Sequence, residues 1–320
     1  MIDALLIMLK NVAVFVLLAV PGVVLIKTKL LKAEHSAVLS KLLLYVGMPF
    51  LILNSTLNVS FNEELLKLVL ISAAIGLGYT LLCVWLSKPA ASMEKNTKTQ
   101  GMMRFCMVFA NNGFIGIPLA TAVLEEGSNA MAYLIILNII TNVTMFTLGV
   151  YLISGDKSAI NVKKAVLNPV LIAFVAGIIL NVAGVGKAVP ELQTYSTHLK
   201  GIVTPLSMVI LGMKLAGVKF SRLFSSWRMY YVSAVRLVVF GILGVAVAYG
   251  LHLIPVLSLT EDTVVGFFFA FAMPTAGLAA AFADQYKGDS DNAVIFTLGT
   301  TVLSVATIPV LYWLLRLFVG

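Results

Sequence analysis

Two adjacent asparagines, Asn111 and Asn112, lie in FANNGFIGIPL, residues 109–119, inside an apolar stretch that otherwise suits a membrane helix. Gly113, Gly116 and Pro118 follow them in the same stretch. Asparagine, glycine and proline are poor helix-interior residues, and proline lacks the N–H that a helix needs. The stretch therefore predicts a broken helix, whose amides and unpaired backbone groups are available to a ligand.

A second interruption, AMPTAG at residues 272–277, places Met273, Pro274 and Thr275 in another apolar stretch. If both helices break and cross at mid-membrane, the ends of four half-helices converge there. Half-helix N-termini favour anions, whereas C-terminal ends and carbonyls favour cations. We therefore predict a substrate site at the crossing. The alternative is a pair of simple kinks packed against small residues.

Other polar residues lie inside apolar runs. Asn138, Thr141 and Asn142 share one helical face by their spacing, and they either line a substrate path or bond neighbouring helices. Arg236 lies well inside an apolar run, where a charge indicates function. It holds either a substrate carboxylate or a structural cluster of carbonyls, or it extends to the cytoplasmic membrane surface about two helical turns away.

The composition predicts an all-α polytopic membrane protein. Of 320 residues, 60% are hydrophobic and 11% charged, against about 25% charged in soluble domains, and mean hydropathy is +1.01. The expected partner is the lipid bilayer, because the net charge of +8 lies in short loops rather than in a nucleic-acid-binding patch. Ten spans are expected, at residues 4–26, 38–57, 65–87, 101–124, 130–152, 167–184, 199–216, 229–251, 263–283 and 292–315.

Basic loops alternate with acidic or neutral ones along these spans. By the positive-inside rule, both termini lie outside a multi-pass protein of the inner (plasma) membrane. Pro49 and Pro118 are 118 − 49 = 69 residues apart, as are Pro205 and Pro274, at 274 − 205 = 69. The offset of 205 − 49 = 156 predicts two inverted five-helix repeats, residues 1–153 and 167–320, joined by a short cytoplasmic linker at 154–166.

These motifs resemble those of the auxin efflux carrier family, which includes the plant PIN exporters and bacterial organic-acid permeases. The fourth-span pattern is matched, with Ala110 where the family has serine, by Asn111, Gly113, Phe114, Gly116 and Pro118. The ninth-span pattern is matched by Met273, Pro274, Asp284 and Tyr286, and Arg236 resembles a family arginine. The resemblance implies that helices 4 and 9 cross at their prolines, as in the related bile-acid sodium symporters. It also implies a homodimer.

The prediction is a secondary active transporter of small organic anions such as carboxylates, working by alternating access around helices 4 and 9. The alternatives are a channel or a transporter-like receptor, and a sodium-coupled symporter of a bile-acid-like substrate. No resident cofactor or metal is expected, and the sequence does not decide between a proton and sodium as coupling ion. An enzyme is not expected, because no Ser/His set, aspartate pair or HExxH motif lies within the spans.

Overall fold

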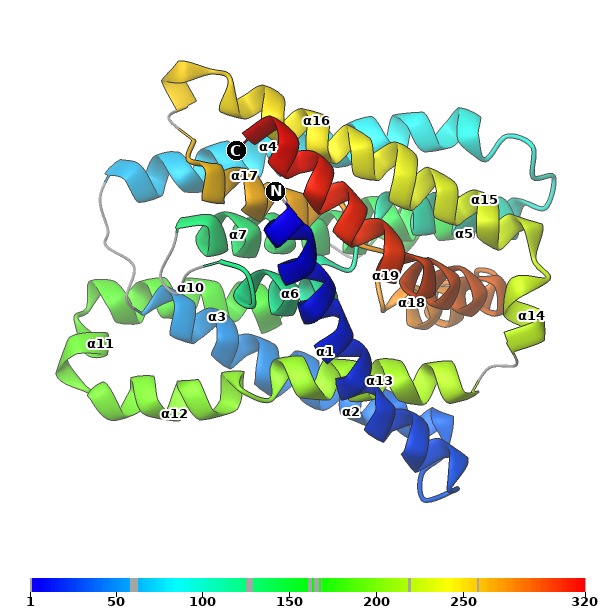
Figure 1. Cartoon of the computed structure of the whole chain (residues 1–320), viewed down its shortest axis with the longest axis horizontal. Coiled ribbons are helices and arrows are strands. Elements are labelled where there is room, and N and C mark those ends of the chain that lie inside the picture. Colours follow the sequence, from blue (N-terminus) through cyan, green and yellow to red (C-terminus); the bar gives the residue numbers. More distant parts are fainter. Residues whose placement is uncertain are drawn as a thin grey trace. The chain divides into compact units, whose positions relative to one another are not determined.

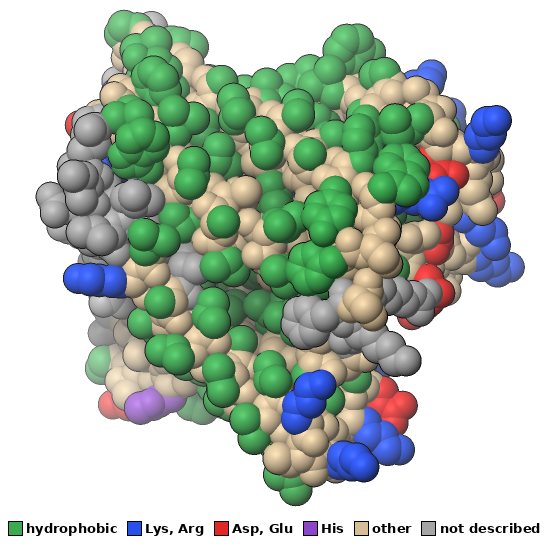
Figure 2. All heavy atoms as spheres, turned by 45° about the vertical axis from the view of Figure 1, so that its right-hand side comes forward, with side chains coloured by type: hydrophobic (Ala, Val, Ile, Leu, Met, Phe, Trp, Pro, Cys, Tyr) green, Lys and Arg blue, Asp and Glu red, His purple; other side chains and the backbone are tan. Residues whose placement is uncertain are grey.

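A computed structural model describes residues 2–57, 63–124, 129–160, 163, 167, 169–217, 220–257 and 259–319. Within these residues the secondary structure is helical, apart from one isolated antiparallel bridge between Ala110 and Thr275 (Figure 1). The predicted all-α class is confirmed. Figure 2 shows hydrophobic side chains over most of the face in view, with charged side chains collected towards its margins.

Six helical segments in the described residues are long and apolar enough to cross a membrane, so the chain is a polytopic membrane protein. They match predicted spans 2, 3, 5, 7, 8 and 10, and they are Ala33–Thr56, Val69–Ala90, Ala130–Ser154, Pro190–Gly217, Trp227–His252 and Ser290–Val319. Spans 1 and 6 contain shorter apolar helices, Ala13–Lys27 and Pro169–Val182. The helices of spans 4 and 9 are interrupted, as predicted.

The chain divides into two compact units, each assembled from separated segments. Unit 1 consists of Met1–Lys10, Ser72–Ala165 and Phe220–Gly320, and unit 2 of Asn11–Ile71 and Val166–Lys219. Both predicted halves, 1–153 and 167–320, contribute to both units. The boundary between the two compact units therefore differs from the boundary between the two predicted repeats.

Unit 1 is centred on α17, Glu261–Phe271, whose residues from Thr263 onward are all buried. A helix that is apolar on all sides fits only where other helices surround it, and α17 packs against α7 and α16. The elements of this unit, besides most of α4 Glu63–Ala90, are α5 Thr97–Val108, η3 Asn112–Gly116, α6 Ile117–Thr121, α7 Asn129–Thr144, η4 Met145–Gly149, α8 Val150–Ser154, η5 Lys157–Ala159, α14 Phe220–Phe224, α15 Trp227–Ser233, η6 Ala234–Val239, α16 Phe240–His252, η7 Pro255–Leu257, α17, α18 Ala279–Gln285 and α19 Ser290–Val319.

Unit 2 is held together by small residues at close helix contacts. Its elements are most of α1 Ile2–Lys27, with η1 Ala33–His35, α2 Ser36–Leu42, η2 Leu43–Gly47, α3 Met48–Thr56, α10 Pro169–Val182, α11 Val185–Ala188, α12 Pro190–Lys200 and α13 Val203–Gly217. A Cβ added to Gly212 of α13 would lie 1.9 Å from the Ala19 carbonyl oxygen of α1. Such contacts are how membrane helices approach without a hydrophobic driving force.

Replacing Gly212 by alanine should therefore lower the thermal unfolding temperature. The methyl group meets backbone that cannot rotate away, and overpacking of this kind costs about 1–3 kcal/mol. The matched control is Gly78→Ala on α4, because nothing lies within 4 Å of its added Cβ. Unfolding in detergent should separate the two variants, and equal melting temperatures would show that α1 and α13 are not in this close contact.

Glu94 fixes the connection between α4 and α5 to unit 1. One of its carboxylate oxygens accepts the backbone N–H of Asn96 at 3.0 Å, and the other accepts Nε of Arg228 at 2.5 Å. The side chain is 6% exposed. The Asn96 hydrogen bond first, and then Arg228, hold the pKa of Glu94 below its ordinary value, so folding favours the charged carboxylate.

This lowered pKa predicts an acid-sensitive contribution to stability. The contribution is complete above the pKa of an unfolded glutamate, about 4.3, and disappears as pH falls through the lower native value. We expect Glu94→Gln to be less stable than the native protein at neutral pH and to lose less stability on acidification. Glu261→Gln is the control, because Glu261 is 55% exposed and lies 3.6 Å from Arg316. Parallel melting curves for all three proteins across pH 3 to 7, roughly the span over which carboxylates titrate, would contradict the assignment.

Candidate functional site

Two helices of unit 1 are interrupted at mid-length. The first helix, α5, ends at Val108, and helical structure resumes at Asn112 as the π-helical turn η3, which continues into α6. The second, α17, ends at Phe271, and helical structure resumes at Ala279 with α18. Each interruption leaves backbone N–H and C=O groups without helical partners, which a membrane interior does not hydrate.

The two interruptions satisfy part of this demand by bonding to each other. They form an antiparallel bridge between Ala110 and Thr275. Two backbone hydrogen bonds flank it, from the Asn111 N–H to the Pro274 carbonyl at 2.7 Å and from the Ala276 N–H to the Phe109 carbonyl at 2.8 Å. The breaks are therefore joined through main-chain atoms, as adjacent strands would be.

Arg236 donates hydrogen bonds to backbone carbonyls at the C-terminal ends of the same two helices. Its side chain is fully buried, with 0% exposure. It donates to the Met107 and Val108 carbonyls at the end of α5, each at 3.1 Å from Nη1, to the Met273 carbonyl at 2.8 Å from Nε, and from Nη2 to the carbonyl of Phe271 at the end of α17. The sequence left open a substrate carboxylate or a carbonyl cluster for Arg236. The structure places it on the carbonyl cluster.

Local backbone structure directs Arg236 to this position. It lies in η6, a π-helical turn between α15 and α16. A π-helical turn inserts an extra residue into a helix and rotates the side chains that follow, and such turns are frequent at functional sites. The guanidinium also faces the C-termini of two helices, each equivalent to roughly half a negative charge.

Thr275 fixes the second break to two further elements. Its hydroxyl donates to the Cys106 carbonyl of α5 at 2.8 Å, and its N–H donates to Oγ1 of Thr300 on α19 at 3.2 Å. Thr275 has 0% exposure. No sequence signal could have shown that the carbonyl of Cys106, rather than its thiol, takes part.

Asn112 belongs to a buried amide network with α7. Its Oδ1 accepts Nδ2 of Asn138 at 2.8 Å, and its Nδ2 donates to Thr141 Oγ1 at 2.9 Å and to the Ala270 carbonyl at 3.5 Å. Asn142 in turn donates to Asn138 Oδ1 at 3.2 Å. The structure therefore brings Asn112, Asn138 and Asn142 together, and the first of them is only 1% exposed.

Asn111 differs from its neighbour in having unused hydrogen-bonding capacity. Its side-chain oxygen caps η3 by accepting the Phe114 N–H at 3.3 Å. The side chain is half-buried, and its Nδ2 has no acceptor among the described residues. A Cβ added to half-buried Gly277 would lie 3.2 Å from that Nδ2, which places the second break beside it. Asn111 therefore presents an accessible N–H donor at the crossing.

The glycines and the first proline of the motif have other roles. Gly113 and Gly116 are buried in η3, and a Cβ on Gly116 would lie 2.5 Å from the Phe269 carbonyl of α17. Pro118 is the second residue of α6 and directly follows the π-helical turn η3. The expectation that the helices cross at their prolines is therefore wrong for the fourth span. The break lies at residues 109–111 and is paired through Ala110, whereas Pro274 does lie in the second break.

In the part of the chain that the structure describes, no three His, Cys, Asp or Glu side chains are arranged to hold a metal ion. What the site offers is an amide donor, a buried amide network and the ends of interrupted helices. Interrupted membrane helices with converging ends are the binding arrangement of membrane transporters. The fold and the site therefore define a polytopic membrane protein of the transporter class.

Comparison with known proteins identifies the family. The chain belongs to the membrane transport protein family, the auxin efflux carrier family, which it matches over residues 6–312. It is also similar to an uncharacterized transporter of Methanothermobacter thermautotrophicus, with 27% identity over 304 residues, 93% of this chain and 94% of the relative. The family resemblance seen in the broken-helix motifs is thereby confirmed.

Arg236 should be essential for folding stability at the crossing. Arg236→Gln leaves the carbonyls at two helix ends without their donors, and each unsatisfied buried group costs about 1–3 kcal/mol. Arg236→Lys retains the charge but offers fewer donors in a different geometry, so it should melt between the native protein and the glutamine variant.

Arg316→Gln on α19 is the control for removing an arginine. Arg316 is partly exposed, and its guanidinium lies 3.6 Å from the Glu261 carboxylate rather than against buried carbonyls. Thermal unfolding of the purified variants in detergent measures the effect. If Arg236→Gln melted like Arg316→Gln, the carbonyl cluster would not be stabilising the two helix ends.

Proposed function

We propose that this protein is a secondary active carrier of small organic anions, such as carboxylates, which bind at the crossing of the two interrupted helices. The observation that carries the proposal is that the C-terminal and N-terminal helix ends at the crossing differ in whether a charged group balances them. The negative C-terminal ends of α5 and α17 are occupied by Arg236. Among the residues that the structure describes, the N-terminal end of the η3–α6 helix has no corresponding anionic partner.

Electrostatics supports an anion at that N-terminal end. Neither η3 nor α6 has an acidic residue in its first turn, so the partial positive charge of this end is not balanced locally. The half-buried Nδ2 of Asn111 adds a directed N–H donor there. A carboxylate accepts several N–H donors at once, and it is the small organic group that fits both features.

The order of elements in unit 1 supports an inverted repeat. A long helix, a helix ending at a break, a short helix and a second long helix occur as α4, α5, η3–α6 and α7–α8, and again as α15–α16, α17, α18 and α19. The bridged residues are 275 − 110 = 165 apart, and the starts of α5 and α17 are 261 − 97 = 164 apart. We propose this register in place of the 156-residue offset of the prolines.

An inverted repeat of this kind supports ten membrane spans, both termini outside and alternating access about the crossing. The bonded breaks would move as one body, with the substrate exposed first to one side of the membrane and then to the other. This mechanism distinguishes a carrier from a channel or a receptor with a carrier fold, because carrier flux saturates with substrate.

Replacing Asn111 by alanine should reduce carboxylate uptake into proteoliposomes by about tenfold or more, with only a small fall in the melting temperature. The alanine removes the accessible donor, and one charge-assisted hydrogen bond is worth about 1.5–3 kcal/mol. The cap on η3 is lost as well, at about 1 kcal/mol. Asn111→Asp keeps the cap but places a negative charge at the site, so it should also lose uptake.

Asn292→Ala is the matched control, since it removes another half-buried asparagine of unit 1, at the start of α19. The assay is uptake of labelled carboxylates from malate to indole acids, and of a steroid acid, with and without sodium and at two pH values, alongside melting temperatures. Full uptake by Asn111→Ala would exclude that side chain from the site. Native uptake that never saturates would favour a channel, and strict dependence on sodium with a steroid acid would favour the symporter alternative.

A further inference from the structure

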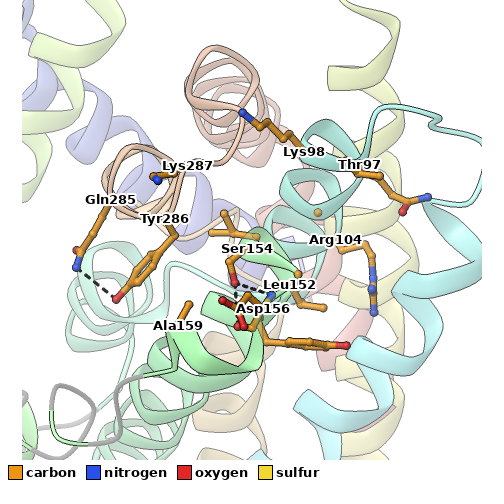
Figure 3. A pocket seen from close by; sticks show the side chains of 15 residues that line it. Thr97, Lys98, Arg104, Leu152, Ser154, Asp156, Ala159, Gln285, Tyr286 and Lys287 are labelled. Carbon is orange, nitrogen blue, oxygen red and sulfur yellow. Dashed lines mark hydrogen bonds between the residues drawn. The ribbon is translucent and has the colours of Figure 1, made fainter.

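Unit 1 contains a cavity of about 650 Å³, distinct from the crossing, where three of its helices end (Figure 3). Its walls come from the first turns of α5, the end of α8 with the turn that follows, and the end of α18. Ser154 is the last residue of a helix long enough to span a membrane, and Gln285 is the last residue of α18. The cavity therefore lies at the level where helices leave the bilayer.

The cavity is lined by three cations and by one acidic residue. Lys98 and Lys287 are exposed, Arg104 is half-buried, and none of the three lies within ion-pair distance of a carboxylate among the described residues. The Arg104 guanidinium donates to Ser87 Oγ at 3.2 Å and to the Val84 carbonyl of α4 at 3.3 Å. The acidic residue, Asp156, is occupied by the N–H and hydroxyl of Ser158, at 2.8 and 2.5 Å. These bonds lower the pKa of Asp156, so it remains ionised within its own turn. The cavity retains an excess of positive charge.

Lys287, in the wall of this cavity, has an unfavourable backbone conformation. Its φ is 58°, in the left-handed region, and the Gly288 N–H donates to the Ala283 carbonyl at 2.8 Å, which completes a C-terminal cap of α18. Glycine is the usual residue at such a position. Gly155 caps α8 in the same cavity wall with a φ of 68°. At the equivalent place on α18 the chain carries a charged side chain instead.

We propose that this cavity binds the phosphate-bearing headgroup of an anionic phospholipid. The shared chemistry is a phosphate anion, which Lys98 and Lys287 would contact, with Arg104 adding positive charge from the wall. Tyr151 and half-buried Tyr286 offer amphipathic rings of the kind found at membrane interfaces. A lipid is favoured over a free phosphate because the cavity lies at the ends of membrane helices and two of its cations are exposed. Basic pockets between membrane helices are typical headgroup sites.

A headgroup bound here would contact α5, α8 and α18 together. Both α5 and α18 lead from this cavity to a break at the crossing. The lipid would thus stabilise the arrangement of the interrupted helices from their far ends. The binding itself does not depend on which substrate is carried.

The test is retention of phosphatidylglycerol or phosphatidylcholine by the purified full-length protein, measured by native mass spectrometry and by the melting temperature. We expect preferential retention of phosphatidylglycerol. Lys98→Gln and Lys287→Gln should each weaken it about fivefold, as expected for one lysine at an anionic membrane surface. Lys287→Gly is the sharper variant, because it should raise the melting temperature by relieving the left-handed backbone while still weakening retention.

Lys29→Gly is the matched control. Lys29 also has a left-handed φ, of 61°, belongs to unit 2 and is not one of the residues that line the cavity. It should gain stability and retain the lipid unchanged. Equal retention of the two lipids, or native retention by Lys287→Gly, would overturn the proposal. Binding of free glycerol phosphate as tightly as the lipid, with the same sensitivity to Lys98→Gln, would overturn the lipid assignment in favour of a soluble anion site.

Discussion

The guanidinium of Arg236 lies between the negative ends of two helices, and the interrupted architecture of unit 1 depends on it. Two helix C-termini brought together in a medium of low polarity repel each other, and neither can be hydrated there. Together they carry roughly one negative charge, which one buried arginine balances without a carboxylate. A buried cation and two open helix ends are each unfavourable alone. In this arrangement each compensates the other.

This compensation explains how polarity is distributed around the crossing. Most polar groups there are bonded to the protein: Thr275 to a carbonyl, Asn112 to the amides of α7, and the backbone of each break to the other. Such bonds fix positions but leave little capacity for a ligand. The accessible capacity is concentrated at Asn111, beside an uncompensated helix N-terminus. A small recognition site inside a well-bonded frame suits a carrier, because the frame can move while the site keeps its geometry.

Much of this was visible in the sequence, and the rest was hidden for identifiable reasons. Hydropathy predicts the spans, and the asparagines, glycines and prolines predict which helices are interrupted. The first break lies away from Pro118, where the family resemblance implies the crossing. Pro118 follows the π-helical turn η3, whereas the extended backbone at Phe109 marks the break.

The partners of Arg236 could not be predicted, because backbone carbonyls carry no signature in a sequence. The choice between a substrate and a carbonyl cluster depended on where α5 and α17 end in space. The same applies to the cavity at the helix ends, whose lysines are far apart in the chain and resemble ordinary loop charges. Sequence patterns identify side chains with unusual surroundings. They do not report where main-chain groups become available.

The bridge at the crossing has a consequence for which side chains can occupy position 110. Its two hydrogen bonds use backbone atoms of residues 109, 111, 274 and 276, so no side chain has to supply them. Ala110, which stands where the family pattern has serine, is 8% exposed and needs only to be small. At this position the bridge therefore limits the volume of the side chain and asks for no particular chemistry.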